Sequence, residues 1–289
     1  MQQYHDLVSR VLVQGTETED RTGVGTTSLF GERMVFRQVN NYFPLLSTKY
    51  TYWAGVVKEL LWFISGSTDV KVLKDQGVNI WNEWVGKDGT IGPLYGAMWR
   101  SWPNGDGTHV DQLQNIINTL RTNPDSRRMC LNVWNPSLLP DEGISPSDNV
   151  DNGKQALAPC HPFIQFYSRK AGEYRFLSLQ VYIRSNDLFL GAPFNIASYA
   201  LLLCMVAHIT GHHVENLHYL IGDAHIYSNH KDQVEKMQRR WEKGSELISD
   251  KKVRGMFEGD IKEIEDFNVD NIILEGYDPL SAIPAPVAV

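Results

Sequence analysis

The spacing of apolar side chains along the chain alternates between the period of a helix and the period of a strand. Residues 2–15 place their apolar side chains on one face of a helix that Gly15 can end. Residues 27–36 alternate between apolar and polar side chains, as a half-buried strand does. Residues 52–65 return to the helical period and have a strongly apolar centre. The first quarter of the chain therefore already mixes helices and strands.

The rest of the chain continues this mixture. Helices are predicted over residues 70–76, 111–123, 196–210 and 231–243, and strands over residues 129–134, 163–167, 175–183 and 217–221. Asn195 opens the helix of residues 196–210, which Gly211 stops. Residues 136–155 are polar and contain three prolines, which predicts a mobile loop without chemistry of its own. A chain of 289 residues fits one large domain or two small ones.

The composition is that of a soluble globular protein, with 42% apolar and 21% charged residues. A net charge of −7 disfavours dedicated nucleic-acid binding, which needs a basic surface, but a few local arginines would suffice to bind a phosphate. The N-terminus lacks the charged and apolar regions of a signal peptide, and no apolar run is long enough to span a membrane. We therefore expect no membrane association.

The three cysteines are widely spaced, which argues against both a disulfide framework and a zinc site. We expect no metal, and a cytoplasmic location in a reducing cytosol, that of a host cell if the protein is viral. Buried cysteines are usually small apolar residues without chemistry, and we interpret Cys130 and Cys204 in that way. Cys160 differs because Pro159 restrains the backbone before it and His161 follows it.

A Cys-His pair also suggests a cysteine hydrolase. However, adjacent residues on a strand point to opposite faces, so His161 would be a poor base for Cys160. A second polar segment can supply a cation, which favours the nucleophilic thiolate. This segment offers a cation, a hydroxyl, a carboxylate and carboxamides at Arg184, Ser185, Asp187, Asn186 and Asn195. We expect the two segments to form one pocket.

Three further features are candidates for the functional site. Glu59 precedes five apolar residues, and a carboxylate in such surroundings needs partners. Residues 79–102 contain four tryptophans and a tyrosine, which suit stacking on a flat heterocycle, although Trp99 and Trp102 are interpreted as core. The glycine-rich loop of residues 20–26 could wrap an anion.

Two more segments have an open interpretation. His225 and Tyr227 share a face if they are extended. His225 and His230 lack a third ligand at the spacing of a metal site, which argues against zinc. Residues 285–289 are either a frayed end or a closing lid that carries the terminal carboxylate.

Taken together, the motifs make the whole chain resemble thymidylate synthase. The motifs that carry the resemblance are Asp20-Arg21-Thr22-Gly23, Glu59-Leu60-Leu61-Trp62, Ser126-Arg127-Arg128, Ala158-Pro159-Cys160-His161, Arg184-Ser185-Asn186-Asp187, Pro193-Phe194-Asn195-Ile196-Ala197-Ser198-Tyr199, His225-Ile226-Tyr227-Ser228-Asn229-His230 and Ala285-Pro286-Val287-Ala288-Val289. The resemblance implies one α/β (α+β) domain over residues 1–289, with a mixed sheet layered with helices. It also implies a homodimer packed sheet to sheet, with deoxyuridylate (dUMP) as substrate and 5,10-methylenetetrahydrofolate as co-substrate.

The resemblance also implies a role for each matching residue. The implied catalytic residues are Cys160, Glu59, Tyr95, His161, Asn195 and Asp187. The implied substrate-binding residues are Arg21, Arg127, Arg128, Arg184, Ser185, Asn186, Asp187, Asn195, His225 and Tyr227, with Arg127 and Arg128 donated by the partner subunit. The implied folate-binding residues are Tyr52, Ile80, Trp81, Asp187, Leu190, Gly191, Phe194 and Ala288.

The implied chemistry is covalent catalysis, in which the Cys160 thiolate attacks C6 of uracil and makes C5 a nucleophile. Donors at Asn195, at His161 and on water ordered by Glu59 would meet the charge that develops at O4. The Asn195 carboxamide both donates and accepts, which matches the O4 and N3–H of uracil, whereas an aspartate would suit cytosine. We therefore predict uracil over cytosine.

Several positions depart from the family pattern. They are Tyr50, Tyr52, Asn82 and Ile183, together with a long segment over residues 136–155. Because some lie where folate handling can change, the alternative is a dUMP hydroxymethylase, in which water replaces hydride. A catalytically silent binding protein is a third hypothesis, which the intact set of Cys160, Glu59 and Asn195 disfavours. RNA binding as a side activity has no support in the acidic composition.

Overall fold

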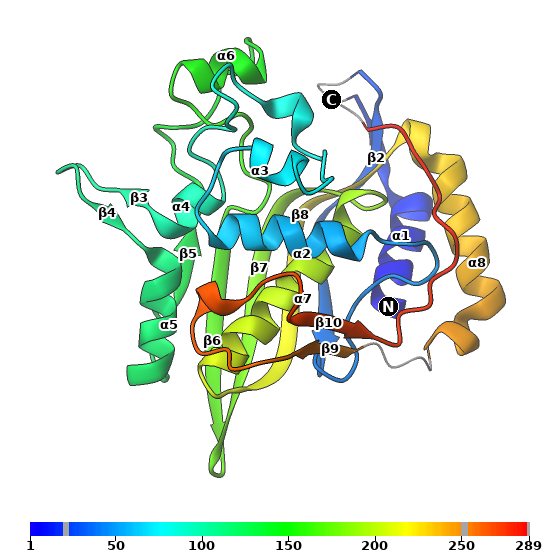
Figure 1. Ribbon diagram of the computed structural model, residues 1–289. Coiled ribbons are helices and arrows are strands. Elements are labelled where there is room, and N and C mark those ends of the chain that lie inside the picture. Colours follow the sequence, from blue (N-terminus) through cyan, green and yellow to red (C-terminus); the bar gives the residue numbers. More distant parts are fainter. Residues whose placement is uncertain (20–22, 250–253, 288–289) are drawn as a thin grey trace.

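The computed structural model describes residues 1–19, 23–249 and 254–287, and its centre is a mixed sheet of six strands in the order β1-β2-β8-β7-β6-β5 (Figure 1). Its strands are β1 (Thr16–Thr18), β2 (Thr26–Arg37), β5 (Cys130–Asn132), β6 (Phe163–Ala171), β7 (Tyr174–Asp187) and β8 (His213–Tyr227). Only the β7–β8 pair is parallel within this sheet. Two small hairpins lie outside it, formed by β3 (Trp102–Pro103) with β4 (His109–Val110) and by β9 (Arg254–Phe257) with β10 (Ile272–Glu275).

Helices cover one face and both edges of this sheet. The helices are α1 (Gln2–Gln14), α2 (Trp53–Ile64), α3 (Lys71–Lys74), α4 (Gly96–Arg100), α5 (Gln112–Thr122), α6 (Pro146–Asp151), α7 (Gly191–Ile209) and α8 (Lys231–Ser249), with 3-10 turns η1 (Asn82–Trp84), η2 (Ser228–His230) and η3 (Ile264–Asp266). Helix α7 packs on β7 and β8, and α2 packs on α7 (Figure 1). Helices α1 and α8 lie together beside the β2 edge.

Helix α7 is the core helix of the fold. It connects the parallel strands β7 and β8, and nearly all of its residues from Ile196 to Ala207 are fully buried. By length and composition alone it could cross a membrane, so the expectation that no apolar run is long enough was wrong. However, 83% of its apolar window is buried inside the fold. A helix that is apolar all round fits the centre of a large protein as well as it fits a membrane.

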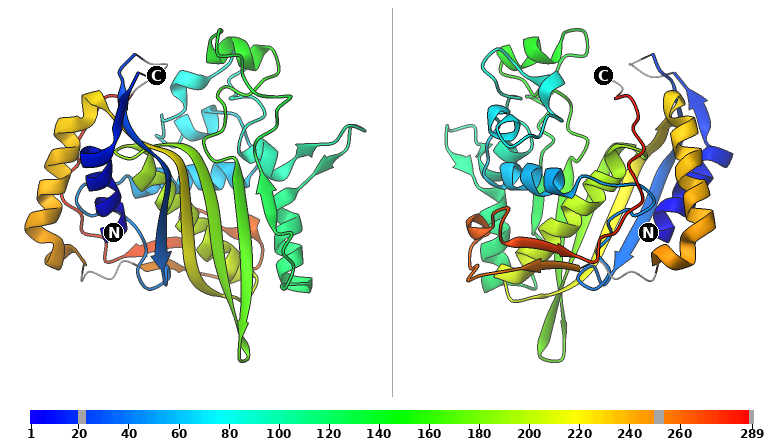
Figure 2. Two further views of the ribbon diagram at one scale, coloured as in Figure 1. Left: turned by 180° about the vertical axis from the view of Figure 1, so that it is seen from behind. Right: turned by 45° about the vertical axis from the view of Figure 1, so that its right-hand side comes forward.

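No helix in the described part of the chain covers the opposite face of the sheet (Figure 2). Its side chains are largely polar, and it also exposes aromatic residues such as Tyr167 and Tyr182. Arg169 forms an ion pair with Glu215 on this face, over 2.6 Å. A sheet face that presents aromatic side chains to solvent is a candidate surface for a second subunit.

The sheet also brings together the segments that the sequence marked as polar. In the β7–β8 register, Ser185 lies opposite Asp223 and Asp187 lies opposite His225. The backbone N–H of Arg184 donates to the carbonyl of Cys160 over 2.9 Å. The ends of β7 and β8 and the start of β6 therefore meet at one edge of the structure.

Most predicted elements are present, with some boundary differences. Strands β7 and β8 extend beyond the predicted ends as far as Asp187 and Tyr227, because paired neighbours stabilise polar residues that no local pattern would place in a strand. Helix α7 begins at Gly191, so Asn195 lies inside it and does not open it. Gly15 follows α1, but its φ of −67° is not the left-handed conformation of a glycine cap.

The segment of residues 136–155 is not simply a loop. It contains α6, whose first turn is capped by the Ser145 hydroxyl accepting from the backbone N–H of Asp148. The Asn149 and Gln155 side chains in this segment are buried, and Gln155 donates to the carbonyl of Pro93 over 2.9 Å. These buried amides anchor the segment, a feature that composition alone does not predict.

Candidate active site

Cys160 lies in an irregular segment just before β6, and not on a strand as the sequence analysis assumed. Its backbone N–H donates to the Tyr95 hydroxyl over 2.9 Å. The Arg184 guanidinium donates from Nε to the carbonyl of Pro159 over 2.9 Å and from Nη2 to that of Ala158 over 2.7 Å. Arg184 and Tyr95 thus fix the backbone on both sides of the thiol, as a positioned nucleophile requires.

Within one chain, the described residues around Cys160 do not lower the pKa of its thiol below the ordinary value. Burial raises its pKa above the ordinary value, and the nearby Arg184 lowers it by less. The Arg184 Nη2 atom lies 4.0 Å from the sulfur. The expectation that arginines near Cys160 favour its thiolate is therefore not met by Arg184 alone, because desolvation outweighs a single cation.

The other two cysteines lie outside this arrangement. Cys204 is buried in α7, where burial raises its pKa to about 12. Burial also raises the pKa of Cys130, which starts β5. Thiols with raised pKa values are poor nucleophiles at neutral pH, which agrees with their interpretation as apolar residues.

Glu59 is buried in α2 at 6% exposure, and the indole Nε1 of Trp81 donates to its Oε1 over 2.8 Å. Burial raises its pKa to about 7, while the bond from Trp81 opposes the rise. The Trp81 ring in turn packs edge-on against Tyr95, with centroids 5.8 Å apart. Glu59 can therefore gain or lose a proton near neutral pH in an aromatic enclosure, which is a property of catalytic acids and bases.

His161 is buried between two tyrosines, with its ring centroid 5.2 Å from that of Tyr95 and 5.4 Å from that of Tyr199. Burial lowers its pKa to about 4, although a hydrogen bond with the Asn195 side chain opposes that shift. The imidazole is therefore neutral at physiological pH and carries one donor and one acceptor nitrogen. It can assist a neighbour through hydrogen bonding but not through charge.

Asn195 belongs to a row of three polar side chains from three elements. The Nδ2 of Asn186 on β7 donates to the Oδ1 of Asn195 on α7 over 3.2 Å. The Tyr219 hydroxyl on β8 donates to the Oδ1 of Asn186 over 2.8 Å. The sequence analysis missed Tyr219, since one tyrosine in a strand gives no signal of its own.

Asp187 ends β7, and its Oδ1 accepts the backbone N–H groups of Phe189 and Leu190 over 2.8 and 3.2 Å. His230 approaches the same oxygen with its Nδ1 at 3.9 Å. The buried Lys49 lies over the Phe189 ring, 4.5 Å from its centroid. Burial lowers the pKa of Lys49 to about 8, and Asp187 opposes the shift. Asp187 is therefore a fixed carboxylate beside a buried cation that the sequence analysis did not select.

His225 and Tyr227 lie at the end of β8 with ring centroids 5.1 Å apart, which agrees with the prediction that they share one face. His225 is buried, and its Nδ1 lies 3.4 Å from an oxygen of Asp223. Ser185 lies opposite Asp223 in the neighbouring strand. Both residues thus lie at the edge of the sheet where Cys160 and Arg184 meet.

The remaining predicted site residues are less tightly placed. Leu190, Gly191 and Phe194 are half-buried at the start of α7, close in sequence to Asp187. Tyr52 and Ile80 are exposed at 40% and 43%. Their assignment to folate binding stays a prediction.

The predicted substrate-binding arginines differ in where they lie. Arg184 lies beside Cys160, as described above. Arg127 and Arg128 are exposed in the loop before β5, and no hydrogen bond or ion pair holds either side chain among the described residues. The predicted residues Arg21 and Ala288 lie outside the described part of the chain.

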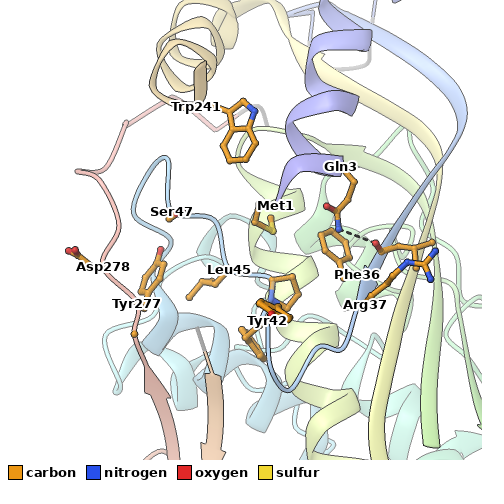
Figure 3. Close-up of a pocket in the computed structure, with 14 residues that line it drawn as sticks. Met1, Gln3, Phe36, Arg37, Tyr42, Leu45, Ser47, Trp241, Tyr277 and Asp278 are labelled. Carbon is orange, nitrogen blue, oxygen red and sulfur yellow. Dashed lines mark hydrogen bonds between the residues drawn. The ribbon is translucent and has the colours of Figure 1, made fainter. Parts of the chain in front are cut away.

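A cavity of about 450 Å³ lies elsewhere, where the start of α1 meets the segment around Tyr277 (Figure 3). Its lining combines aromatic side chains, among them Phe36, Tyr42 and Trp241, with aliphatic and polar residues. None of the predicted site residues lines it. In the described residues, no group of three His, Cys, Asp or Glu side chains is arranged to hold a metal ion.

The comparison with known protein families agrees with this arrangement. A family model described as thymidylate synthase matches residues 2–289, which is nearly the whole chain.

Proposed function

The chain belongs to the thymidylate synthase family, and on that basis we propose that it converts dUMP to thymidylate with 5,10-methylenetetrahydrofolate. Family membership implies a methyltransferase-type enzyme with dUMP and folate as ligands. The single observation that carries the finer proposal is the position of Cys160. Tyr95 and Arg184 hold its backbone segment, and the neutral His161 follows it in the chain. Tyr95 in turn packs against Trp81, which donates to the titratable Glu59.

Cys160 is the proposed nucleophile. Its sulfur bonds to C6 of uracil, and the electron pair of the C5–C6 double bond moves towards C5 and O4. This step needs the thiolate, which one arginine does not sufficiently favour in the free chain. The proposal therefore assigns the rest of the activation to further arginines around the nucleotide phosphate, for which Arg127 and Arg128 of a partner subunit are the candidates.

Asn195 and His161 are the proposed donors for the charge that develops at O4. A fixed donor in a site without water stabilises such charge more than water does. His161 fits this role as a neutral hydrogen-bonding group, because a cation there would resist burial. Glu59 is proposed to order water that completes the donor set, with its pKa near 7 allowing it to pass a proton.

The residues present fit a folate. Methylenetetrahydrofolate would supply the one-carbon unit and, in a synthase, the hydride. Both backbone donors to the Asp187 carboxylate use Oδ1, so Oδ2 can accept N–H groups of a pterin. Trp81, Leu190 and Phe194 provide apolar surface for a flat ring. The role of this chain is then to orient the ring and to keep water away from the reacting carbon.

Late in the reaction C5 must lose its proton, and the bond between C6 and sulfur must break. We propose that Tyr95 takes part in the proton loss, which is supported by its hydroxyl lying 2.9 Å from the backbone nitrogen of Cys160. Burial raises the pKa of Tyr95 well above its ordinary value. We therefore assign it a role in orienting water that accepts the proton, and not in accepting the proton as a phenolate.

We also propose a homodimer that packs sheet to sheet. The uncovered face of the sheet, with exposed Tyr167 and Tyr182, supports this arrangement. The exposed side chains of Arg127 and Arg128, which no hydrogen bond or ion pair within the described residues holds, support their donation to the site of the partner subunit. The site would be incomplete in a monomer.

The alternative is a dUMP hydroxymethylase, in which water captures the one-carbon unit. Tyr50 and Tyr52, two departures from the family pattern, are exposed at 44% and 40% and can alter water access on the folate side. Ile183, a third departure, is fully buried and lies opposite Ile221, directly before Arg184.

Mass spectrometry of both products tests the proposal. The purified protein is incubated with dUMP and methylenetetrahydrofolate. Thymidylate with dihydrofolate is the expected result. Hydroxymethyl-dUMP with tetrahydrofolate would replace the synthase by the hydroxymethylase. Failure to release tritium from C5-labelled dUMP would contradict both and favour a silent binding protein.

A further inference from the structure

The carboxamide of Asn195 does not by itself determine which base it binds. Rotation by 180° about its last side-chain bond exchanges its donor and acceptor. In one orientation the Nδ2 group meets O4 of uracil and the Oδ1 atom meets N3–H. In the other orientation the same two atoms suit the amino group and N3 of cytosine. Base selectivity therefore depends on whatever holds Asn195 in one orientation.

His161 cannot provide that constraint. Its side chain is hydrogen-bonded to Asn195, and its lowered pKa keeps the ring neutral. A neutral imidazole has one donor and one acceptor nitrogen, and its proton can move between them. His161 can therefore adapt to either orientation of Asn195.

Asn186 and Tyr219 do constrain it. Asn186 donates from Nδ2 to the Oδ1 of Asn195, and its own Oδ1 accepts the Tyr219 hydroxyl. If Asn195 alone rotated, two NH₂ groups would face each other. If Asn186 rotated as well, Tyr219 would have to accept, and its proton would need another partner at a fully buried position. Asn186 is itself only 3% exposed, so water is a poor substitute.

We propose that Asn186 and Tyr219 are positioning residues that hold the Asn195 carboxamide in the orientation complementary to uracil. This inference rests on the proposed function, in which Asn195 contacts the base. The three side chains have a fixed direction, because the Tyr219 proton points to Asn186 and the Asn186 protons point to Asn195. The Nδ2 of Asn195 is then directed to O4, and its Oδ1 retains a lone pair for N3–H.

The experiment is equilibrium binding of dUMP and of dCMP to the full chain without folate, by calorimetry. The measured quantity is the dissociation constant of dCMP divided by that of dUMP. This ratio does not depend on the reaction that follows. We expect the wild-type protein to bind dUMP at least on the order of tenfold more tightly. Asn186→Asp is compared with the wild type at pH 8, where N3 of uracil keeps its proton and an ionised carboxylate at position 186 can only accept. It keeps the bond from Tyr219 but favours the rotated Asn195, so the ratio should fall by on the order of a hundredfold.

The second variant is the double substitution Asn186→Leu with Tyr219→Phe, which removes both partners and leaves no buried donor unpaired. Asn195 is then free to rotate, and the ratio should approach one. Ile221→Val is the matched control, because Ile221 is buried on the same strand two residues from Tyr219 and takes no part in the row. It should leave the ratio unchanged.

The outcomes separate the inference from the proposed function. If the wild type prefers dUMP and both variants weaken the two nucleotides equally, Asn186 and Tyr219 are merely structural and the inference is wrong. A wild-type protein that does not bind dUMP would refute the proposed function itself, and the inference with it. A thermal unfolding curve for each variant identifies any loss of binding that results from unfolding.

Discussion

The Trp81 indole donates to the Glu59 carboxylate over 2.8 Å, in surroundings that raise the pKa of Glu59 to about 7. The two residues are 22 positions apart, and one comes from α2 and the other from the segment before η1. The pair combines a buried acid with a single neutral donor. That combination explains why the carboxylate is only partly stabilised.

Glu59 should make stability depend on pH. Its folded pKa of about 7 exceeds the ordinary value of 4.5, so the folded protein binds more protons than the unfolded chain between these values. The free energy of unfolding should therefore fall as pH rises from 4.5 to 7 and then level off. Glu59→Gln should lose this slope and be more stable than wild type above pH 7, by about 1–3 kcal/mol. Urea unfolding at several pH values tests this, and parallel curves for the two proteins would contradict it.

Trp81→Phe should move the pH at which Glu59 titrates. The indole donor opposes the raised pKa, so its loss should raise that pKa further, by roughly one unit. The midpoint in the pH profile of the turnover rate is the measurement, because a packing defect would lower the rate without moving the midpoint. Trp84→Phe is the control, since Trp84 packs edge-on against Trp81. An equal shift in the control would exclude the hydrogen bond as the cause.

Arg184→Gln should raise the pKa of Cys160, because Arg184 is the cation that lowers it. The variant is studied with Cys130→Ser and Cys204→Ala, which leave one thiol. The rate of alkylation by iodoacetamide is measured against pH, and the midpoint of that profile should rise. Arg175→Gln is the control, because Arg175 lies on the same strand but pairs with Asp125. An unchanged midpoint in Arg184→Gln would show that Arg184 only holds the backbone.

His230→Phe should loosen the C-terminal segment. The His230 Nε2 lies 2.7 Å from the carbonyl of Pro286, and the ring packs against Phe189 and Tyr227. Phenylalanine keeps this packing and removes the donor. Amide hydrogen exchange over residues 281–287 should accelerate by roughly three- to tenfold, which corresponds to the free energy of losing one hydrogen bond. His213→Phe, at an exposed position, should not change it, and equal exchange in all three proteins would contradict this role for His230.

Hybrid dimers test the donated arginines. Cys160→Ala and the double variant Arg127→Ala with Arg128→Ala should each be inactive alone. If the arginines act across the interface, unfolding and refolding an equal mixture should restore about a quarter of wild-type activity. Half of the dimers are then hybrids, each with one intact site. No recovery would place the arginines in the site of their own chain, provided that sedimentation confirms a dimer.

The sequence determined the elements and the family. Apolar periodicity predicts α1, α2, α5 and β2, because the spacing of apolar residues along an element shows which of its side chains face a core. The motif containing Cys160 was recognisable for a similar reason, since it is short and contiguous. The helix α6 was missed because its anchors are amides such as Asn149, whose partners no local pattern reveals.

Only the tertiary structure determined the electrostatic properties of the site. The raised pKa of Glu59, the lowered pKa of His161 and the poorly activated Cys160 all follow from burial, which depends on segments distant in the chain. The direction of the row from Tyr219 to Asn195 likewise depends on two strands and a helix that meet. The sequence specifies which residue types are present. The desolvation of their side chains and the direction of their hydrogen bonds depend on neighbours that only folding brings together.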